Sequence, residues 1–219
     1  MNSTTVIMDL KPKQGAEFVV SSKGKSATLS CEFTGRYNST VTADIELVVG
    51  SAASRGRPIT TLVKELSEHV KSGGLLRATG QFDNHAWQER ATGAEHEKLC
   101  LFAYFLEPSD EVQPIYSLVS IIGNVKLTEG SGERMKDGLV VSHGFCVTTP
   151  PPPFGFEKST FLTFWVQARG EQVQRVSNLK SFGDKSYVSI SGKLEAGKTG
   201  MLRVRLFDIG YAKYPKRKE

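Results

Sequence analysis

The two halves of the sequence repeat one order of β-rich and helical segments, and this repeat limits the possible folds more than any other feature. The second half reads as five β-rich segments, with the short helical segment EQVQRVSNLKSFG between the third and the fourth. The first half follows the same order, with the helical segment PITTLVKELSEHVKSGG in the same place, and Gly80 and Gly192 lie within the two fourth segments. This order is typical of the OB-fold. The sequence therefore predicts an all-β fold with short helices, arranged as two tandem five-stranded OB-fold barrels.

A break between the halves is expected at residues 106–114, LEPSDEVQP, where two prolines and three acidic residues interrupt β-rich sequence. At 219 residues, the chain is long enough for each half to bury a core of its own. We therefore expect an N-terminal OB-like domain over residues 1–108, used for assembly or accessory binding, and a second OB domain over residues 114–212. A basic tail follows over residues 213–219.

Basic residues are concentrated in the second half. The net charge of the chain is +5. Residues 1–110 hold 12 lysines and arginines against 13 acidic residues, whereas residues 111–219 hold 16 against 10. A basic half beside a neutral half indicates that one half contacts a polyanion, with solubility as the alternative explanation.

The third β-rich segment of the second half, STFLTFWVQARG, has two different faces. Its residues alternate, with Leu162, Phe164, Val166 and Ala168 on one face and Phe161, Thr163, Trp165, Gln167 and Arg169 on the other. A half-buried strand ordinarily places short polar or charged side chains on its outer face. A tryptophan beside an arginine costs solubility unless a ligand or a partner covers it, so we expect this face to bind something.

Several stretches of the second half share a pattern with a known family. They are IIGNVKL, FCVTT and FWVQARGEQVQRVSNLKSFGDKSYVSISGKLE. Six residues fit the pattern K-G-x-x-V-x-I-x-G-x-L with small shifts: Lys180, Gly183, Val188, Ile190, Gly192 and Leu194. Over residues 116–210, the sequence resembles the bacterial single-stranded DNA-binding protein family, SSB. The first half resembles SSB only through the internal repeat.

The resemblance implies a non-catalytic protein that coats single-stranded DNA (ssDNA) in replication, repair or recombination and needs no cofactor. SSB proteins commonly present four OB domains per assembly, so a chain with two such domains implies a homodimer. The C-terminal sequence GYAKYPKRKE differs from the acidic, apolar-tipped tail of SSB, so recruitment of other proteins through such a tail is not expected. This difference is typical of a phage, plasmid or divergent bacterial member of the family.

Sequence-tolerant ssDNA binding needs aromatic side chains for the bases and cations for the phosphates. On the third strand of the second half, Trp165 is the expected stacking platform, Arg169 pairs with a phosphate or stacks, and Gln167 hydrogen-bonds a base edge. On the fifth strand, Arg203 and Arg205 are two residues apart, so they share one face and would follow a phosphate backbone.

Further ssDNA contacts are expected from neighbouring elements. Tyr187 is expected to point outward from the fourth strand, and the loop PPPPFGFEK is expected to clamp the DNA, as loops do in OB-folds. The expected ssDNA-binding residues are Trp165, Arg169, Gln167, Phe161, Arg203, Arg205, Phe207, Tyr187, Phe154, Phe156 and Lys158.

The equivalent third strand of the first half, TVTADIELVVG, places Asp44 and Glu46 on its outer face with Thr42 and Val48. Two carboxylates repel phosphates, so we expect the first barrel not to bind ssDNA through this face. Binding elsewhere on the first half stays open because of four other side chains: Arg55, Arg57, His85 and Trp87.

No catalytic or metal-binding set is found in the sequence, so neither an enzyme nor a metal site is expected. The stretch GKLEAGKT, residues 192–199, matches the phosphate-binding pattern GxxxxGK[ST], but such a loop must lead into a helix, and the next residues alternate as a strand. We expect AGKTG to be a hairpin turn. Cys31, Cys100 and Cys146 are widely spaced, which indicates buried thiols rather than disulfides or a zinc site.

The expected location is the cytoplasm, either on the nucleoid or in a host cell if the protein is phage-encoded. No apolar run reaches the roughly 20 residues of a membrane span, so no membrane partner is expected. The N-terminus MNSTTVIMDLKPK also lacks the basic and apolar regions of a secretory signal.

Two other functions stay open. The chain is also consistent with an OB protein that binds RNA or serves as a primosome-like adaptor, because no residue is committed to a 2′-hydroxyl. It is also consistent with an assembly protein in which another chain buries the face of Trp165, since aromatic residues are enriched at protein interfaces. Arg203 and Arg205 are equally consistent with a solvated strand face.

Overall fold

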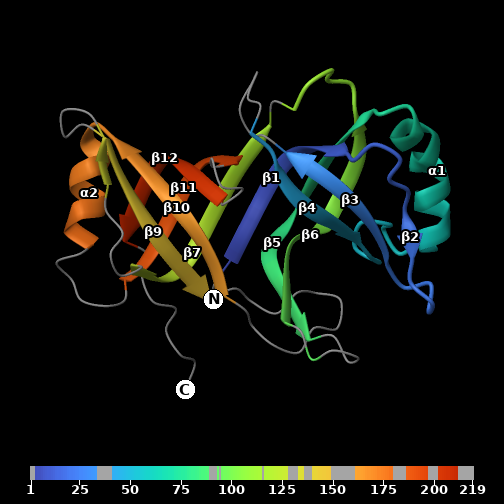
Figure 1. Cartoon of the computed structure of the whole chain (residues 1–219), viewed down its shortest axis with the longest axis horizontal. Coiled ribbons are helices and arrows are strands. Elements are labelled where there is room, and N and C mark those ends of the chain that lie inside the picture. Colours follow the sequence, from blue (N-terminus) through green and yellow to red (C-terminus); the bar gives the residue numbers. More distant parts are fainter. Residues whose placement is uncertain are drawn as a thin grey trace.

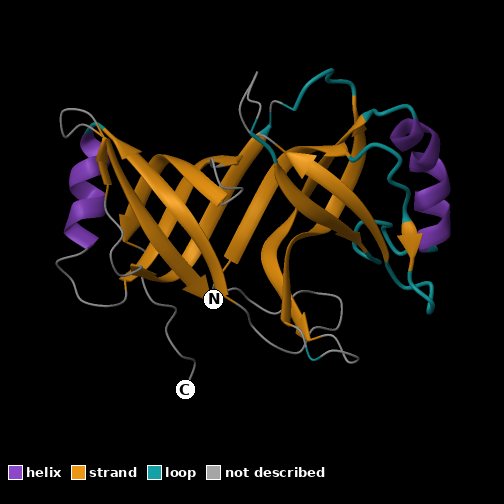
Figure 2. Cartoon of the chain, in the orientation of Figure 1, coloured by secondary structure: helices purple, strands orange, loops and turns teal. Residues whose placement is uncertain are grey.

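The computed structural model describes residues 3–33, 41–88, 93, 95–114, 116–127, 133–135, 140–148, 161–179, 186–196 and 202–211. These residues form twelve strands and two helices. The elements are β1 (Ser3–Pro12), β2 (Val19–Val20), β3 (Ala27–Phe33), β4 (Ala43–Val49), α1 (Ile59–Lys71), β5 (Leu75–Gln88), β6 (Glu95–Ser109), β7 (Ser117–Leu127), β8 (Glu133–Met135), β9 (Val140–Thr148), β10 (Phe161–Arg169), α2 (Glu171–Leu179), β11 (Ser186–Ala196) and β12 (Leu202–Tyr211). The strands occupy the middle of the molecule, and the two helices lie at its opposite ends (Figures 1 and 2).

Five strands of the N-terminal half pair in a closed cycle, which we name the first strand cycle. β1 pairs with β3, β3 with β4, β4 with β6, β6 with β5, and β5 with β1. Only the β4–β6 pairing is parallel. Between β4 and β5 in the chain, α1 buries Ile59, Leu62, Leu66 and Val70, whose spacing of three and four residues places them on one side of the helix.

Five strands of the C-terminal half form a second strand cycle with the same order of pairing. β7 pairs with β9, β9 with β10, β10 with β12, β12 with β11, and β11 with β7. Again the third and fifth strands of the cycle, β10 and β12, are the parallel pair. α2 lies between the third and fourth strands, as predicted, and buries Val176 and Leu179. A mostly β chain with two helices and a closed five-stranded barrel is therefore confirmed.

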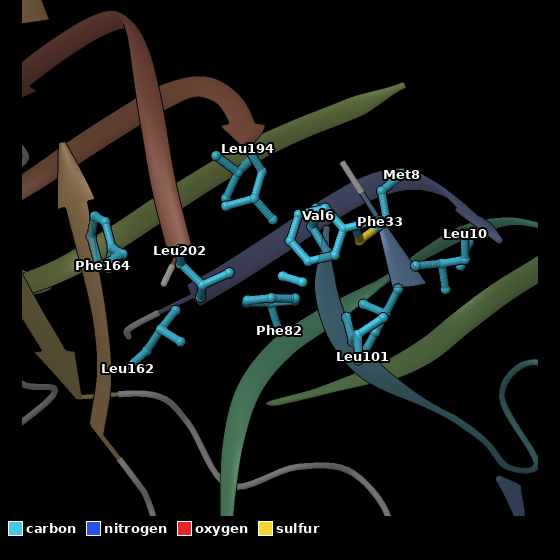
Figure 3. Packing of buried hydrophobic residues seen from close by; sticks show 14 of the residues in the cluster. Val6, Met8, Leu10, Phe33, Phe82, Leu101, Leu162, Phe164, Leu194 and Leu202 are labelled. Atoms are coloured by element: carbon cyan, nitrogen blue, oxygen red, sulfur yellow. The ribbon is translucent and has the colours of Figure 1, made fainter. Parts of the chain in front are cut away.

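The two cycles share one sheet and one core. β1 pairs antiparallel with β7 over six residue pairs, from Ser3 opposite Ile122 to Met8 opposite Ser117. A single cluster of buried side chains runs through both cycles. In Figure 3, Phe82 from β5 lies among core side chains from both halves, with Leu162 and Leu202 on the side of the second cycle.

The predicted break at residues 106–114 begins later than expected. β6 continues to Ser109, and Leu106 and Pro108 are still paired with β5. Pro108 is tolerated because β4 pairs with β6 only at residues 100–103, which leaves the other edge of β6 without a partner strand at Pro108. Irregular backbone between the cycles therefore starts at Asp110.

Gly80 and Gly192 lie at equivalent β-bulges. The register of β5 with β6 shifts at Gly80, and the register of β11 with β12 shifts at Gly192. A Cβ atom on either glycine would overlap a backbone carbonyl oxygen of the neighbouring strand, that of Phe102 or that of Arg205. Only glycine permits this close approach, so the repeated glycine in the sequence marks a repeated feature of the backbone.

Candidate nucleic-acid interface

The outer side of the second strand cycle places Trp165 next to Arg203. β10 and β12 run parallel, and their register opposes Trp165 to Arg203 and Gln167 to Arg205. Directly opposed residues on neighbouring strands point to the same side of a sheet. The residues that alternate with them on both strands are buried in the core. The predicted alternation of β10 and β12 is therefore confirmed.

β11 adds two charged side chains to the same surface. Its register with β12 opposes Lys193 to Arg205 and Glu195 to Arg203. We name the combined surface the Trp165 face. It consists of Trp165, Gln167, Lys193, Glu195, Arg203 and Arg205. Its aromatic and basic side chains have the chemistry that stacks on bases and pairs with phosphates.

Exposure varies across the Trp165 face. Trp165, Lys193, Arg203 and Arg205 are half-buried. Gln167 is only 7% exposed, although it lies on the same side of β10 as the half-buried Trp165. The expected hydrogen bond from Gln167 to a base edge stays a prediction.

Glu195 is a charged residue of this face that the sequence analysis missed. Arg203 Nη2 donates a hydrogen bond to Glu195 Oε2 at 2.8 Å. Arg205 Nη2 lies 2.9 Å from Glu195 Oε1 as an ion pair. One carboxylate therefore neutralises one of the two arginine charges. The signal was present in the alternation of Lys193 and Glu195, because the hairpin to the next strand sets Glu195 opposite Arg203.

The other predicted ssDNA contacts are spread more widely. Phe207 is 54% exposed, but it lies four residues beyond Arg203, roughly 13 Å along the strand. Arg169 is exposed at the end of β10. Tyr187 lies on the opposite side of β11 from Val188 and Ile190, as expected, but it is only 7% exposed. Its contact with ssDNA stays a prediction.

Four other expected contacts also stay predictions. Phe161 belongs to β10, but its side chain lies outside the described residues. Phe154, Phe156 and Lys158, in the loop before β10, also lie outside the described residues.

Tyr104 is an aromatic side chain of the first strand cycle that the sequence analysis also missed. At each bulge, the strand opposite the glycine contains one extra residue, which has no directly opposed partner. This residue is Tyr104 in β6 and Phe207 in β12. Tyr104 is 39% exposed, and its hydroxyl group donates a hydrogen bond to Gln81 Oε1 at 3.0 Å. The equivalent positions of Gly80 and Gly192 in the sequence are the signal that could have found this pair.

The equivalent face of the first strand cycle has acids whose charges are paired. Asp44 is exposed and lies 2.6 Å from Lys13 Nζ. Glu46 is half-buried and forms an ion pair with Lys98. These lysines weaken the repulsion of phosphates that was expected from the two carboxylates.

Three apolar side chains next to these acids form a small buried cluster of their own: Val48, Cys100 and Phe102. The parallel register of β4 and β6 opposes Val48 to Phe102. These residues lie on the other side of the sheet from the main core. This part of the first strand cycle is packed rather than open.

Arg55 and Arg57, the arginines named in the first half, both contact other side chains of that half. The Arg55 guanidinium lies over the ring of Phe105, 5.0 Å from its centroid, on a backbone with a φ of 53°. Arg57 makes two hydrogen bonds to the carboxylate of Glu65. The side chains of His85 and Trp87 lie outside the described residues.

The described residues contain no cluster of histidine, cysteine and acidic side chains that could hold a metal ion. Cys31 and Cys100 are buried, as expected, and burial raises the pKa of the Cys31 thiol to about 12. Ala196 is paired with Leu202 in antiparallel strands, so residues 192–196 belong to a strand and the next described element is β12. The rest of the predicted turn AGKTG lies outside the described residues. None of the helices among the described residues has the length and apolar character needed to cross a membrane.

Comparison with known proteins identifies the fold. The chain is similar in structure to the wild-type single-stranded DNA binding protein from Thermus aquaticus, with a TM-score of 0.63 and 13% sequence identity. The likeness covers 100% of this chain and 97% of that one. The chain has an SSB-like OB-fold. A deletion mutant of the Thermus aquaticus protein gives a TM-score of 0.61 and 12% identity over 99% of this chain and 98% of its own. No family model and no curated protein matches the sequence.

Proposed function

We propose that this SSB-like chain binds ssDNA through the Trp165 face, without sequence preference and without catalysis. Trp165 stacks on a base, and Arg203 and Arg205 pair with phosphates. Stacking on one aromatic side chain is worth roughly 1–3 kcal/mol per base, so a single well-placed ring contributes much of the affinity. Phe207 and Arg169 extend the contact along β12 and at the end of β10.

One observation carries this proposal. The parallel register of β10 and β12 sets Trp165 beside Arg203 on an outward side of the barrel. An aromatic ring next to a guanidinium on a sheet surface supplies both chemistries that a single strand offers at each nucleotide. The likeness in fold to the Thermus aquaticus protein over the whole chain supports the same conclusion.

The proposal includes the organisation of the chain. Two tandem five-stranded OB-fold barrels, over residues 1–108 and 114–212, are followed by a basic tail over residues 213–219. The identical order of pairing in the two strand cycles supports this division. The biological role that fits is the coating of ssDNA in replication, repair or recombination.

A homodimer is the proposed assembly. Ile7 and Leu118 are directly opposed where β1 pairs with β7, and they are 38% and 43% exposed. Exposed apolar pairs at the centre of a sheet favour contact with another protein surface. A second copy on this side would give an assembly with four barrels, and the mass in solution from sedimentation equilibrium tests it.

The test of the proposed function is a titration with oligo-dT, oligo-U and duplex DNA at two salt concentrations. Trp87 is replaced by phenylalanine so that the emission reports on Trp165 alone. We expect strong quenching by oligo-dT, weak binding of duplex DNA and an affinity that falls as salt rises. Absence of oligo-dT binding at low salt would disprove the proposal, and tighter binding of oligo-U would reassign the face to RNA.

A further inference from the structure

Glu195 faces two guanidinium groups with one carboxylate. Its Oε2 accepts a hydrogen bond from Arg203 at 2.8 Å, and its Oε1 lies 2.9 Å from Arg205 Nη2. The Glu195 side chain is 1% exposed, whereas those of Arg203 and Arg205 are 28% and 35% exposed. The carboxylate therefore lies beneath the surface, and parts of both arginine side chains reach solvent.

Each of the two arginines keeps donors that Glu195 does not satisfy, and Glu195 Oε1 is itself buried without a hydrogen-bond partner among the described residues. Each guanidinium carries five N–H donors, and a carboxylate has two oxygen acceptors. Among the described residues, neither Arg203 Nε nor Arg205 Nε has a hydrogen-bond partner, although both atoms are buried. The group of three side chains keeps a net positive charge. The two Nε donors are closed to solvent, but the remaining positive charge attracts a second anion from the solvent side, and a phosphate of the DNA backbone is such an anion.

We propose that Glu195 competes with a DNA phosphate for Arg203 and Arg205 and so limits the affinity for ssDNA. This inference rests on the proposed ssDNA-binding function. In the free protein the carboxylate satisfies one donor of Arg203, lies against Arg205 and cancels one positive charge. When DNA binds, a phosphate takes the remaining donors from the solvent side and weakens the hold of Glu195.

Two consequences follow for binding. The carboxylate lowers the affinity for ssDNA, because the phosphate enters a site that already contains a negative charge. It also lowers the dependence on salt, because the site attracts fewer counterions than two free arginines would. Glu195 thus acts as a limit on affinity, because it lies against both arginines of the Trp165 face.

The decisive variant is Glu195→Gln, which keeps the shape of the side chain and one oxygen acceptor but removes the charge. Oligo-dT titrations at several salt concentrations, followed by Trp165 emission, give the affinity and its salt dependence. We expect the variant to bind roughly fivefold tighter at low salt, the size of effect that one charge pair produces. The slope of log K against log salt should become steeper by about 0.7, equal to one further phosphate contact on a single strand.

The matched control is Asp208→Asn, which makes the same change of charge on β12. Asp208 is 63% exposed and pairs with Arg175 at 2.6 Å, away from Glu195. We expect its affinity to stay within about twofold of the wild type, since an exposed pair contributes little, and its salt slope to stay unchanged. Equal effects of the two variants would assign the change to net charge and overturn the proposal.

A second variant keeps the proposal testable if Glu195→Gln does not fold. Arg203→Gln leaves Arg205 and Glu195 as a neutral pair, so the salt slope should fall by about 0.7. A purely structural role of Glu195 would alter the melting temperature without moving the slope. An unchanged slope in both variants would overturn the proposal.

Different experimental results would overturn this inference and the proposed function. Wild-type protein that binds oligo-dT, with a Glu195→Gln variant of equal or lower affinity, would overturn the inference alone. Wild-type protein that does not bind oligo-dT would overturn the proposed function. In that case, the inference is tested by the change in melting temperature when inorganic pyrophosphate is added. A larger increase for Glu195→Gln than for the wild type supports competition, and equal increases refute it.

Discussion

Equivalent surfaces of the two strand cycles have the same backbone geometry and different chemistry. The third and fifth strands are parallel in both, with matching registers. The equivalent residues in the first and the second cycle are Glu46 and Trp165, Val48 and Gln167, Cys100 and Arg203, and Phe102 and Arg205. Three of the four positions in the first cycle form a buried apolar cluster, whereas the second cycle carries a ring, an amide and two cations.

The comparison extends to a buried carboxylate in each cycle. Asp83 is opposed to Cys100 as Glu195 is opposed to Arg203, and both acids are almost completely buried. In the second cycle the acid pairs with two arginines. The repeated backbone therefore does not determine the function of a surface. The side chains on the third and fifth strands decide whether it is packed or binds a polyanion.

The largest effect that separates the two surfaces is expected from Phe102→Ala. Phe102 is 1% exposed, and removal of a buried aromatic ring lowers the free energy of unfolding by about 3–5 kcal/mol. Arg205→Ala, at the equivalent position, should weaken oligo-dT binding far more than it weakens the fold. Urea unfolding and oligo-dT titration of both variants measure the difference. A Phe102→Ala variant of unchanged stability would show that the first surface is not packed as described.

The next prediction tests whether the backbones of the two cycles are equivalent at the bulges of Gly80 and Gly192. Gly80→Ala and Gly192→Ala each place a Cβ against a carbonyl oxygen of the neighbouring strand. We expect each to lower the free energy of unfolding by about 1–3 kcal/mol, the usual cost of overpacking. Gly210→Ala is the control, because its Cβ would have no atom within 4 Å, and it should change stability by less than about 0.5 kcal/mol. Sensitivity at only one of the two bulges would break the equivalence.

Local patterns in the sequence predicted much of this architecture. Alternation at period 2 assigned the faces of β10 and β12 correctly, because neighbouring residues of a strand point to opposite sides wherever the strand lies. The place of α2 followed from its own periodicity and from the repeat. The glycines at positions 80 and 192 were correctly read as part of the repeat, but the bulges at these positions were not predicted.

Features that depend on contacts between distant residues were not predicted. The burial of Gln167 and Tyr187 depends on what covers the sheet, and alternation gives only the side to which a residue points. The pairing of Glu195 with two arginines depends on the register of β11 with β12. The joining of the halves through β1 and β7 depends on a pairing between segments more than 100 residues apart, which no local pattern contains.

Substitution of Trp165 should weaken ssDNA binding, whereas substitution of Glu46, the equivalent residue in the first cycle, should not. Trp165→Ala removes a stacking platform, so we expect ssDNA binding to weaken by roughly 1–3 kcal/mol and most of the quenching to disappear. Glu46→Gln changes a residue that pairs with Lys98 on a packed surface, and the affinity for oligo-dT should stay the same. Filter binding with labelled oligo-dT measures both variants without relying on tryptophan emission. Equal losses in the two variants would show that DNA contacts both cycles at these positions.

The smallest effect is expected from Asp44→Asn, and it tests how the first cycle avoids DNA. If charge repulsion excluded DNA from this surface, removal of an exposed carboxylate would increase the affinity for oligo-dT. Asp44 already pairs with Lys13 at 2.6 Å, and its side chain is 70% exposed, so solvent and the lysine screen its charge. We therefore expect a change below about 0.5 kcal/mol in both affinity and stability, measured at low salt where charge effects are largest. A clear gain in affinity would mean that charge repulsion keeps DNA away from the first cycle. Our interpretation is instead that the first cycle lacks an exposed aromatic ring and available cations on the described part of this surface.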